Sequence, residues 1–518
     1  MQSKEISFLT IYRNLVIKNY ILYHLKMLNI HFHKRIVTKK SMDYQNREYL
    51  RSVVLYYQDD VFLLNTLIKQ LPRSVRTIQL AGKLDNGNLL IIPSNIKTLR
   101  LGDNIFDSLV IPETLESLDM GSLFKSLIGR SSNFFPTSGL VYLNLGSQFN
   151  DNLKEGVLPT TLKTLKLGSF KENNEAYFPK SITDLDFGDG CRNLKLSSYN
   201  LPPDLVKLRL GKSFNGPLLP GSLPNSLKKL ILPEKYQGEI KQNTFPLSIT
   251  SLKFELFDDD NPGFGIEPKR RDLDLGLLVD LKSLQFGSRF KAKNAPSKLY
   301  KFSTFSKSFS KCFEKMPKEI LSLEFLDRIS NTKNLDLGLS SINVYSLVAP
   351  SISKYISIPE TVKHLTTRNF YVNPHKTITN YSAPKHVVSF RDIYHGHDGK
   401  NRDYSKLTKI KALSTYFTYN YEKFILPTVG NLKLLELNYI FAEDFLMAIV
   451  PSSVETLIIR GAANIKLPLP KNITSIYISS TNYHFLNNIS FRKEPDLMEI
   501  IKVIDDSNDI FKKLIKDL

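Results

Sequence analysis

Apolar residues recur along the chain in a fixed local pattern that repeats over a long period. In the most regular part, Leu165 and Leu167 flank one polar residue and precede Gly168, and the same arrangement returns at Leu208 and Leu210. The two-residue spacing predicts a short strand with one buried face, and glycine permits the turn that ends it. Each unit begins with a proline, and the prolines lie about 22 residues apart: Pro72, Pro93, Pro112, Pro136, Pro159, Pro179, Pro202, Pro224 and Pro246.

A unit of this length cannot bury its own apolar face, so successive units are expected to stack into a solenoid with one continuous core. Ser or Thr stands two residues after most of the prolines, as at Thr161 and Ser226, and we expect these side chains to bond to backbone in the turns. An aromatic row is expected to lie in the core because one face of each coil must be buried. Its members are Phe106, Phe124, Phe149, Phe170, Phe214, Tyr236 and Phe290.

The two fullest units contain Phe149-Asn150 and Phe214-Asn215 shortly after the glycine. This pattern resembles the FNIP repeat, which is named for a Phe-Asn-Ile-Pro core, and other units substitute pairs such as Tyr236-Gln237. The resemblance is specific over residues 71–290 and says little about residues 1–65. It implies a leucine-rich-repeat-like parallel β solenoid, and it implies no established catalytic activity.

The segment before the repeats, residues 1–65, is different in kind. No acidic residue occurs from Ile6 to Met42, and apolar residues recur there at spacings of three and four. We interpret the segment as a basic helical leader that caps the first coil, because a solenoid end exposes a hydrophobic surface. A membrane-surface or presequence-like helix and an F-box-like docking helix set are the competing interpretations.

The remaining chain divides into three segments. Residues 66–290 are predicted to form the regular solenoid, with an acidic loop at about 257–272 that interrupts the period. Degenerate repeats are predicted over 291–490, and a helical C-terminal cap over 491–518. The sequence therefore predicts one repeat solenoid with a helical cap at each end.

Composition limits the function without defining it. The formal net charge of +20 would favour nucleic acid or an anionic surface, and Lys291–Lys315 interleaves basic and aromatic residues. A diverged coil with a solvated lysine face is the simpler interpretation of that stretch. Cys191 and Cys312 are the only cysteines, which excludes a disulfide framework and fits a reducing, cytoplasmic location. Cys191 occupies the aromatic core position of its unit, so we expect it to be buried.

The sequence offers no pattern for catalysis. It lacks a phosphate-binding glycine loop and paired cysteines, and the histidine pairs His31/His33 and His395/His397 have no partner motif at a recognised spacing. We therefore predict a protein that is not an enzyme and has no cofactor or metal.

Solenoids bind partners through exposed strand positions on the concave face. The charges at these positions are mixed, which suits a protein partner better than nucleic acid, where successive phosphates require a uniformly basic groove. We predict an interaction scaffold whose alternatives are a ubiquitin-ligase substrate receptor and an RNA or anionic-membrane binder. The predicted partner-binding residues are Arg100, Asp119, Tyr142, Lys166, Asp186, Arg209, Lys229 and Lys253.

Overall fold

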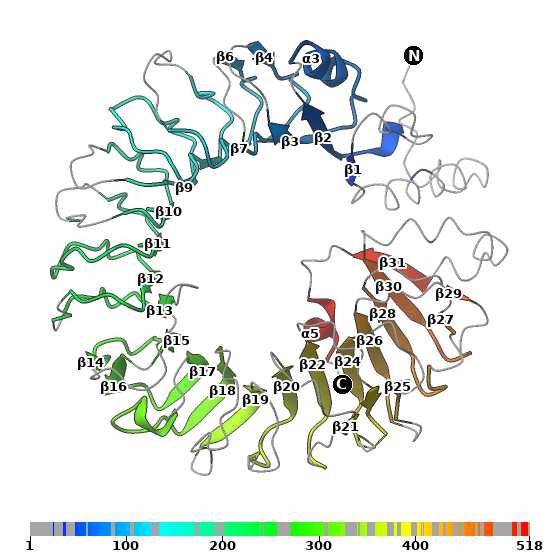
Figure 1. Ribbon diagram of the computed structural model, residues 1–518. Helices are drawn as coiled ribbons and strands as arrows, with labels where there is room; N and C mark the ends of the chain where they lie inside the picture. The colour runs from blue at the N-terminus through cyan, green and yellow to red at the C-terminus, as the bar shows by residue number, and fades with distance from the viewer. Residues whose placement is uncertain are drawn as a thin grey trace, which may run out of the picture.

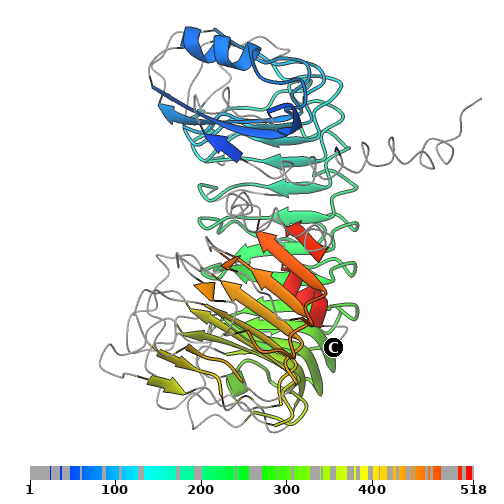
Figure 2. The same cartoon turned by 90° about the vertical axis from the view of Figure 1, so that its right-hand side faces the viewer.

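The computed structural model is a solenoid whose coils follow a wide arc, with one long sheet along the inner side (Figures 1 and 2). The inner sheet has 22 strands, and every recorded pairing between its strands is parallel. Each strand pairs with the strand of the next coil, so strand order in the sheet follows sequence order. The predicted parallel β solenoid is confirmed, and it continues through residues 291–490 as part of the same sheet.

The structure describes the solenoid coils with gaps. The described residues are 24, 35–37, 47–58, 61–83, 89–103, 108–125, 134–170, 176–191, 196, 201–238, 240–241, 243–255, 271–287, 289–304, 309–326, 339, 342–349, 358–369, 378–380, 385–394, 401–405, 407, 409–416, 424–427, 431–438, 445–446, 450–460, 465–466, 471–479, 500–504 and 509–515. The predicted acidic loop and both histidine pairs lie outside these residues, except that the last two residues assigned to the loop begin strand β14.

The strands β5–β11 of the inner sheet have three residues each, and the strands on either side of them are mostly longer. The first half contains β1 (Arg35–Val37), β2 (Ser52–Gln58), β3 (Thr77–Lys83), β5 (Thr98–Arg100), β7 (Ser117–Asp119), β8 (Tyr142–Asn144), β9 (Thr164–Lys166), β10 (Asp184–Asp186), β11 (Lys207–Arg209), β12 (Lys229–Pro233) and β13 (Ser251–Glu255). The second half contains β15 (Ser283–Phe286), β17 (Lys298–Thr304), β18 (Glu319–Phe325), β19 (Asn343–Ala349), β20 (His364–Asn369), β22 (Ser389–Tyr394), β24 (Ala412–Tyr416), β26 (Leu434–Asn438), β28 (Thr456–Ile459), β30 (Ser475–Ser479) and β31 (Ile501–Ile504).

The outer side of the arc is mostly loops and turns with a few short elements (Figure 1). The outer strand groups are β4 (Leu89–Ile91) with β6 (Ser108–Val110), β14 (Arg271–Asp274) with β16 (Phe290–Lys293), β21 (Ile378–Asn380) with β23 (Asn401–Asp403) and β25 (Phe424–Ile425), and β27 (Phe445–Leu446) with β29 (Ile465–Lys466). The helical elements are η2 (Arg47–Tyr49), α3 (Val61–Lys69), η4 (Phe309–Lys311) and α5 (Ile510–Leu514). Among the described residues, no helix is long and apolar enough to cross a lipid bilayer.

The core lies between the inner sheet and the outer loops. The predicted strand pair behaves alike in successive coils, and Leu165 and Leu208, for example, have no exposed surface. The described members of the aromatic row are buried, and two pairs stack nearly parallel, Phe124 on Phe149 and Phe214 on Tyr236. Phe106 lies outside the described residues. The core assignment of the row is therefore confirmed where the structure describes it.

The turn hydroxyls act between coils. The Thr161 hydroxyl donates to the Leu140 carbonyl at 2.8 Å, and the Ser226 hydroxyl donates to the Leu205 carbonyl at 2.8 Å. Each acceptor belongs to the preceding coil. The predicted contact of these hydroxyls with backbone is present, but it ties neighbouring coils together instead of closing the residue's own turn.

Two strands fall in the segment expected to be helical. Strands β1 and β2 pair in parallel with each other, and β2 pairs with β3 over its whole length. The inner sheet thus begins before residue 65, and the predicted boundary there does not coincide with its start. The run Val53-Val54-Leu55 explains the difference, because β-branched and aliphatic residues with buried side chains favour a strand.

Candidate interaction surface

Two rows of side chains on the inner sheet face the concave side of the arc. Across β3–β15 the first row is formed by the first of three paired residues in each strand and the second row by the third, while the middle residue is buried in the core. The pairing register places Thr164, Asp184 and Lys207 next to one another in the first row and Lys166, Asp186 and Arg209 in the second. The predicted residues occupy these rows: Tyr142 and Lys229 the first, and Arg100, Asp119, Lys166, Asp186, Arg209 and Lys253 the second.

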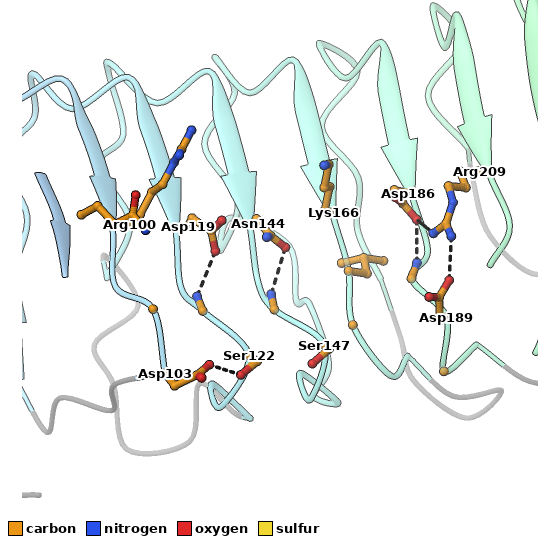
Figure 3. Close-up of a pocket in the computed structure, with 18 residues that line it drawn as sticks. Arg100, Asp103, Asp119, Ser122, Asn144, Ser147, Lys166, Asp186, Asp189 and Arg209 are labelled. Carbon is orange, nitrogen blue, oxygen red and sulfur yellow. Dashed lines mark hydrogen bonds and ion pairs between the residues drawn. The ribbon is translucent and has the colours of Figure 1, made fainter. Parts of the chain in front are cut away.

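A shallow groove of about 490 Å³ follows the second row at the carboxyl ends of strands β3–β11 (Figure 3). Five of the eight predicted residues line it: Arg100, Asp119, Lys166, Asp186 and Arg209. Its floor is the glycine turn that follows each strand. A β-carbon placed on Gly146 would lie 1.7 Å from the Gly121 carbonyl oxygen, so the repeated glycine is what lets successive coils approach at this edge.

Some acidic and amide side chains of the second row accept hydrogen bonds from the backbone of those turns. The Asp119, Asn144 and Asp186 side chains each accept a hydrogen bond from the backbone N–H two residues later, at 3.0, 3.1 and 2.8 Å (Figure 3). Such Asx contacts hold the turn in place. These side chains therefore stabilise the groove as well as line it.

Arg209 is the centre of an ion-pair network on this face. Its guanidinium lies 3.1 Å from Asp186, 2.7 Å from Asp189 and 3.0 Å from Glu255. Burial disfavours the charged guanidinium, but the three carboxylates outweigh that cost and raise the pKa of Arg209 above its ordinary value. Arg209 and Asp186 thus neutralise each other, and they form a rigid part of the surface.

The remaining predicted residues differ in their surroundings. The Lys166 ammonium lies 5.7 Å from the centre of the Tyr142 ring, and Lys253 is 3.2 Å from Glu255. Arg100 and Lys229 are exposed. The structure therefore brings the eight residues onto one face, where part of their charge is already paired.

A basic block lies on the concave face at strands β11, β12, β13, β15 and β17. Its members occupy the two outward rows or the position just before the strand: Lys207, Arg209, Lys228, Lys229, Lys253, Lys282 and Lys301. The carboxylates paired with these residues lie around its edges, as with Asp184 at 3.0 Å from Lys207 and Glu324 at 2.8 Å from Lys301. Within the part of the chain that the structure describes, Lys228 and Lys229 have no carboxylate partner.

The eight predicted partner-binding residues include three members of the basic block, Arg209, Lys229 and Lys253. Lys228 and Lys282 precede their strands, and the backbone bonds Thr250 N–H to Lys228 carbonyl and Lys282 N–H to Thr250 carbonyl show that this position continues the ladder. The lysine directly before each of these two strands is visible in the sequence and could have marked both residues as members of the block. Lys282 lies two strands from Lys228, with Thr250 between them, and placing it there requires skipping residues 256–270, a step that the sequence pattern does not supply.

Three phenylalanines of the basic and aromatic stretch of residues 291–315 pack in the core. Phe302, Phe309 and Phe313 are buried against one another, with centroids of the Phe302 and Phe313 rings 4.8 Å apart. Their faces are unavailable to nucleic-acid bases. The interpretation as a diverged coil is confirmed for these residues.

Both thiols should resist modification in the folded protein. Cys191 and Cys312 are fully buried, and burial together with the charge of Asp186 raises the pKa of the Cys191 thiol to about 12. Because the thiolate is the reactive form, we expect no release of thionitrobenzoate from an aromatic disulfide reagent at pH 8 in native buffer. Two equivalents should react in denaturant, and rapid reaction of either thiol in native buffer would contradict its position in the core.

Comparison with known proteins identifies the repeat. The family model of the FNIP repeat matches residues 132–170 and 193–235. An FNIP repeat-containing protein of Dictyostelium discoideum is 43% identical over 67 residues, which are 12% of this chain and 7% of that protein. A second protein of that description from the same organism is 26% identical over 246 residues, or 44% of this chain and 65% of the relative. The predicted resemblance is thereby confirmed.

The chain also matches a protein described as a kinase and several solved structures. A probable serine/threonine-protein kinase of Dictyostelium discoideum is 34% identical over 106 residues, covering 20% of this chain and 13% of the kinase. Among solved structures, the circular leucine-rich-repeat protein CroV588 covers 88% of this chain and 79% of its own, at 17% identity and a TM-score of 0.41. YopM of Yersinia enterocolitica covers 79% and 88%, at 16% identity and a TM-score of 0.30. The chain thus spans between 7% and 65% of the length of these Dictyostelium relatives.

Proposed function

We propose that this chain, which carries FNIP repeats on a parallel β solenoid, is a non-enzymatic scaffold that binds a protein partner on its concave face. The observation that supports the proposal is the basic block. Five of its basic residues lie in the two rows of strands β11, β12, β13 and β17, Lys228 and Lys282 lie just before strands β12 and β15, and Lys228 and Lys229 are exposed at its centre. We propose that an acidic segment of a partner protein binds there.

The mechanism is multipoint contact with a preformed surface. The inner sheet fixes the spacing of the lysines, and the Arg209 network holds the edge of the block with contacts of 2.7 to 3.1 Å. A rigid surface loses little conformational entropy on binding, so several weak charge contacts can add up to a specific interaction. Mixed charge along the rest of the two rows favours a folded or extended protein segment over a continuous phosphate backbone.

The ubiquitin-ligase alternative depends on the leader. The helices proposed for docking fall almost entirely outside the described residues, and no contact in the described part of the chain supports that role. The interpretation as a substrate receptor therefore remains the second hypothesis drawn from sequence.

Reversing three charges in the basic block tests the proposal. We expect the variant Lys228→Glu, Lys229→Glu, Lys282→Glu to recover at least about tenfold less of the protein partner from a nuclease-treated host lysate, a change of about 1.4 kcal/mol in binding free energy. Quantitative mass spectrometry of the co-purified proteins measures it. Raising the salt concentration should weaken the wild-type interaction, because the contacts are exposed charges.

A matched control changes the same net charge elsewhere. Lys154, Lys180 and Lys241 are exposed and lie in turns outside the inner sheet. Their reversal to glutamate should leave recovery unchanged. Equal recovery with both triple variants would contradict the concave-face proposal, and loss of all partners on nuclease treatment alone would favour the nucleic-acid alternative.

A further inference from the structure

The concave face changes character near the C-terminal end of the solenoid. In strands β24, β26 and β28 the rows on the concave face contain Ala412, Leu434 and Ile458, whose neighbours along the chain, Leu413, Leu435 and Leu457, face the core. Strands β13 and β15 have Ser251 and Ser283 in the row of Ala412 and Leu434, and Lys253 and Gln285 in the row of Ile458. The core is complete without the outward apolar side chains. They form a separate apolar patch on the inner surface, together with Ile504.

The chain's own last helix covers this patch. Phe511 of α5 is 2% exposed and packs into the patch, while Ile510, Leu514 and Ile515 are partly buried around it. Figure 1 shows α5 on the inner side of the arc, beside strands β22 and β24. The sequence predicts a helical cap over residues 491–518, but β31 within this range extends the inner sheet, and the contacts described for α5 are with the inner face.

A polar clamp fixes the start of the helix. Asp509 caps α5 by accepting from the Lys512 N–H at 3.1 Å, and its other oxygen accepts from the Arg391 guanidinium at 2.8 Å. The same guanidinium lies 5.5 Å from the centre of the Phe511 ring. Arg391 thereby recognises both the acidic cap and the aromatic residue that follows it.

Arg391 is held in position independently of the helix. The fully buried Glu436 lies 3.5 Å from the Arg391 guanidinium and accepts from Arg460 Nε at 2.8 Å. Ser414 also donates to Glu436. If α5 leaves, the cation that recognises an acidic cap stays in place beside the apolar patch.

Helix α5 is short, and its ion pair with Arg391 is partly exposed. Five residues are too few for a helix that is stable on its own, so its conformation depends on the patch. The Arg391–Asp509 pair is partly exposed, with side chains 23% and 43% accessible, and such pairs contribute little net stability. An amphipathic helix with an acidic N-cap could replace these apolar contacts and keep the contact with Arg391.

We propose that the patch formed by Ala412, Leu434, Ile458 and Ile504, with Arg391 at its edge, is a docking site for an amphipathic helix of a protein partner. Helix α5 occupies the site until that helix displaces it. The contacts that α5 makes with the patch and with Arg391 define the ligand. It is a helix with an acidic N-cap followed by apolar residues with the spacing of Phe511, Leu514 and Ile515. This site lies on other strands than the basic block, so it can bind or fail to bind independently.

A labelled peptide measures the site directly. The probe is a fluorescent peptide with the sequence of residues 505–518, and fluorescence anisotropy with the full-length protein gives its affinity. We expect the variant Phe511→Ala, Leu514→Ala to bind the peptide at least about tenfold more tightly than wild type, because its own helix competes less well. A peptide of the same composition with its apolar residues out of helical spacing should not bind.

Two substitutions at equivalent positions locate the peptide. Ile458 and Ile231 occupy the same register position in different coils, and only Ile458 belongs to the apolar patch. In the double variant, adding Ile458→Asp should abolish the gain in affinity, while adding Ile231→Asp should preserve it. Equal effects of the two aspartates, or no gain in the double variant, would overturn the proposal.

A gentler variant protects the test against misfolding. Asp509→Lys removes the cap and the ion pair without changing an apolar residue, and it should raise peptide affinity about threefold. No gain with this variant would count against the clamp. If light scattering shows a wild-type dimer that Ile458→Asp dissociates, the occupant is the helix of a second copy, and the assignment to a different protein is wrong.

Discussion

Replacing Phe214 with alanine should lower the free energy of unfolding by about 3 to 5 kcal/mol, because it leaves a large cavity in the core. The Phe214 ring is 1% exposed and stacks on Tyr236 with centroids 5.7 Å apart and planes 7° apart. The Tyr236 hydroxyl donates to the Gly216 carbonyl at 3.1 Å, which holds the Tyr236 ring in place, so that ring is not free to fill the space left by Phe214. Urea denaturation followed by circular dichroism measures the change.

The damage should be greatest near the altered coil. In a solenoid each coil contacts mainly its neighbours, so amide hydrogen exchange should accelerate most over residues 201–238 and less in distant coils. The control is Leu247→Ala, since Leu247 is 63% exposed and its truncation should cost less than about 0.5 kcal/mol. Similar losses for the two variants would show that Phe214 is not part of a tightly packed core.

The repeat pattern predicted the fold because each position acts locally. An alternating pair such as Leu165 and Leu167 determines which strand face is buried, and the regular return of the pair requires coils to stack. The aromatic row and buried Cys191 followed from the same period. These properties depend on short spacings, which a single sequence contains.

The candidate sites were only partly predictable because they depend on register between coils. Positions such as Arg209 could be assigned to the concave face, but its contact with Glu255 joins residues 46 apart and crosses an intervening strand. Lys228 and Lys282 lie two strands apart with Thr250 between them, and an insertion that breaks the period separates them in the sequence. Helix α5 shows the same limit, since an apolar stripe indicates that one face is buried but not which surface buries it.

Gly146→Ala should destabilise the protein by at least about 3 kcal/mol, through the sum of a strained backbone and a clash with a neighbouring coil. The φ angle of Gly146 is +84°, which disfavours any residue with a β-carbon. The new β-carbon would lie 1.7 Å from the Gly121 carbonyl oxygen and 3.5 Å from the Ser122 α-carbon. These are backbone atoms, and the bond from the Met120 N–H to the Asn144 carbonyl at 2.9 Å fixes the distance between the two coils.

Gly156→Ala separates the two causes. The φ angle of Gly156 is +81°, almost the same as that of Gly146, but a β-carbon there would meet no atom within 4 Å. Its replacement should therefore cost only the backbone term, about 1 kcal/mol. The difference between the two alanine variants in urea denaturation measures how closely the coils approach at the edge that forms the groove. Equal destabilisation would mean that the coils can separate there, and the groove would then be a flexible edge instead of the rigid surface that multipoint binding requires.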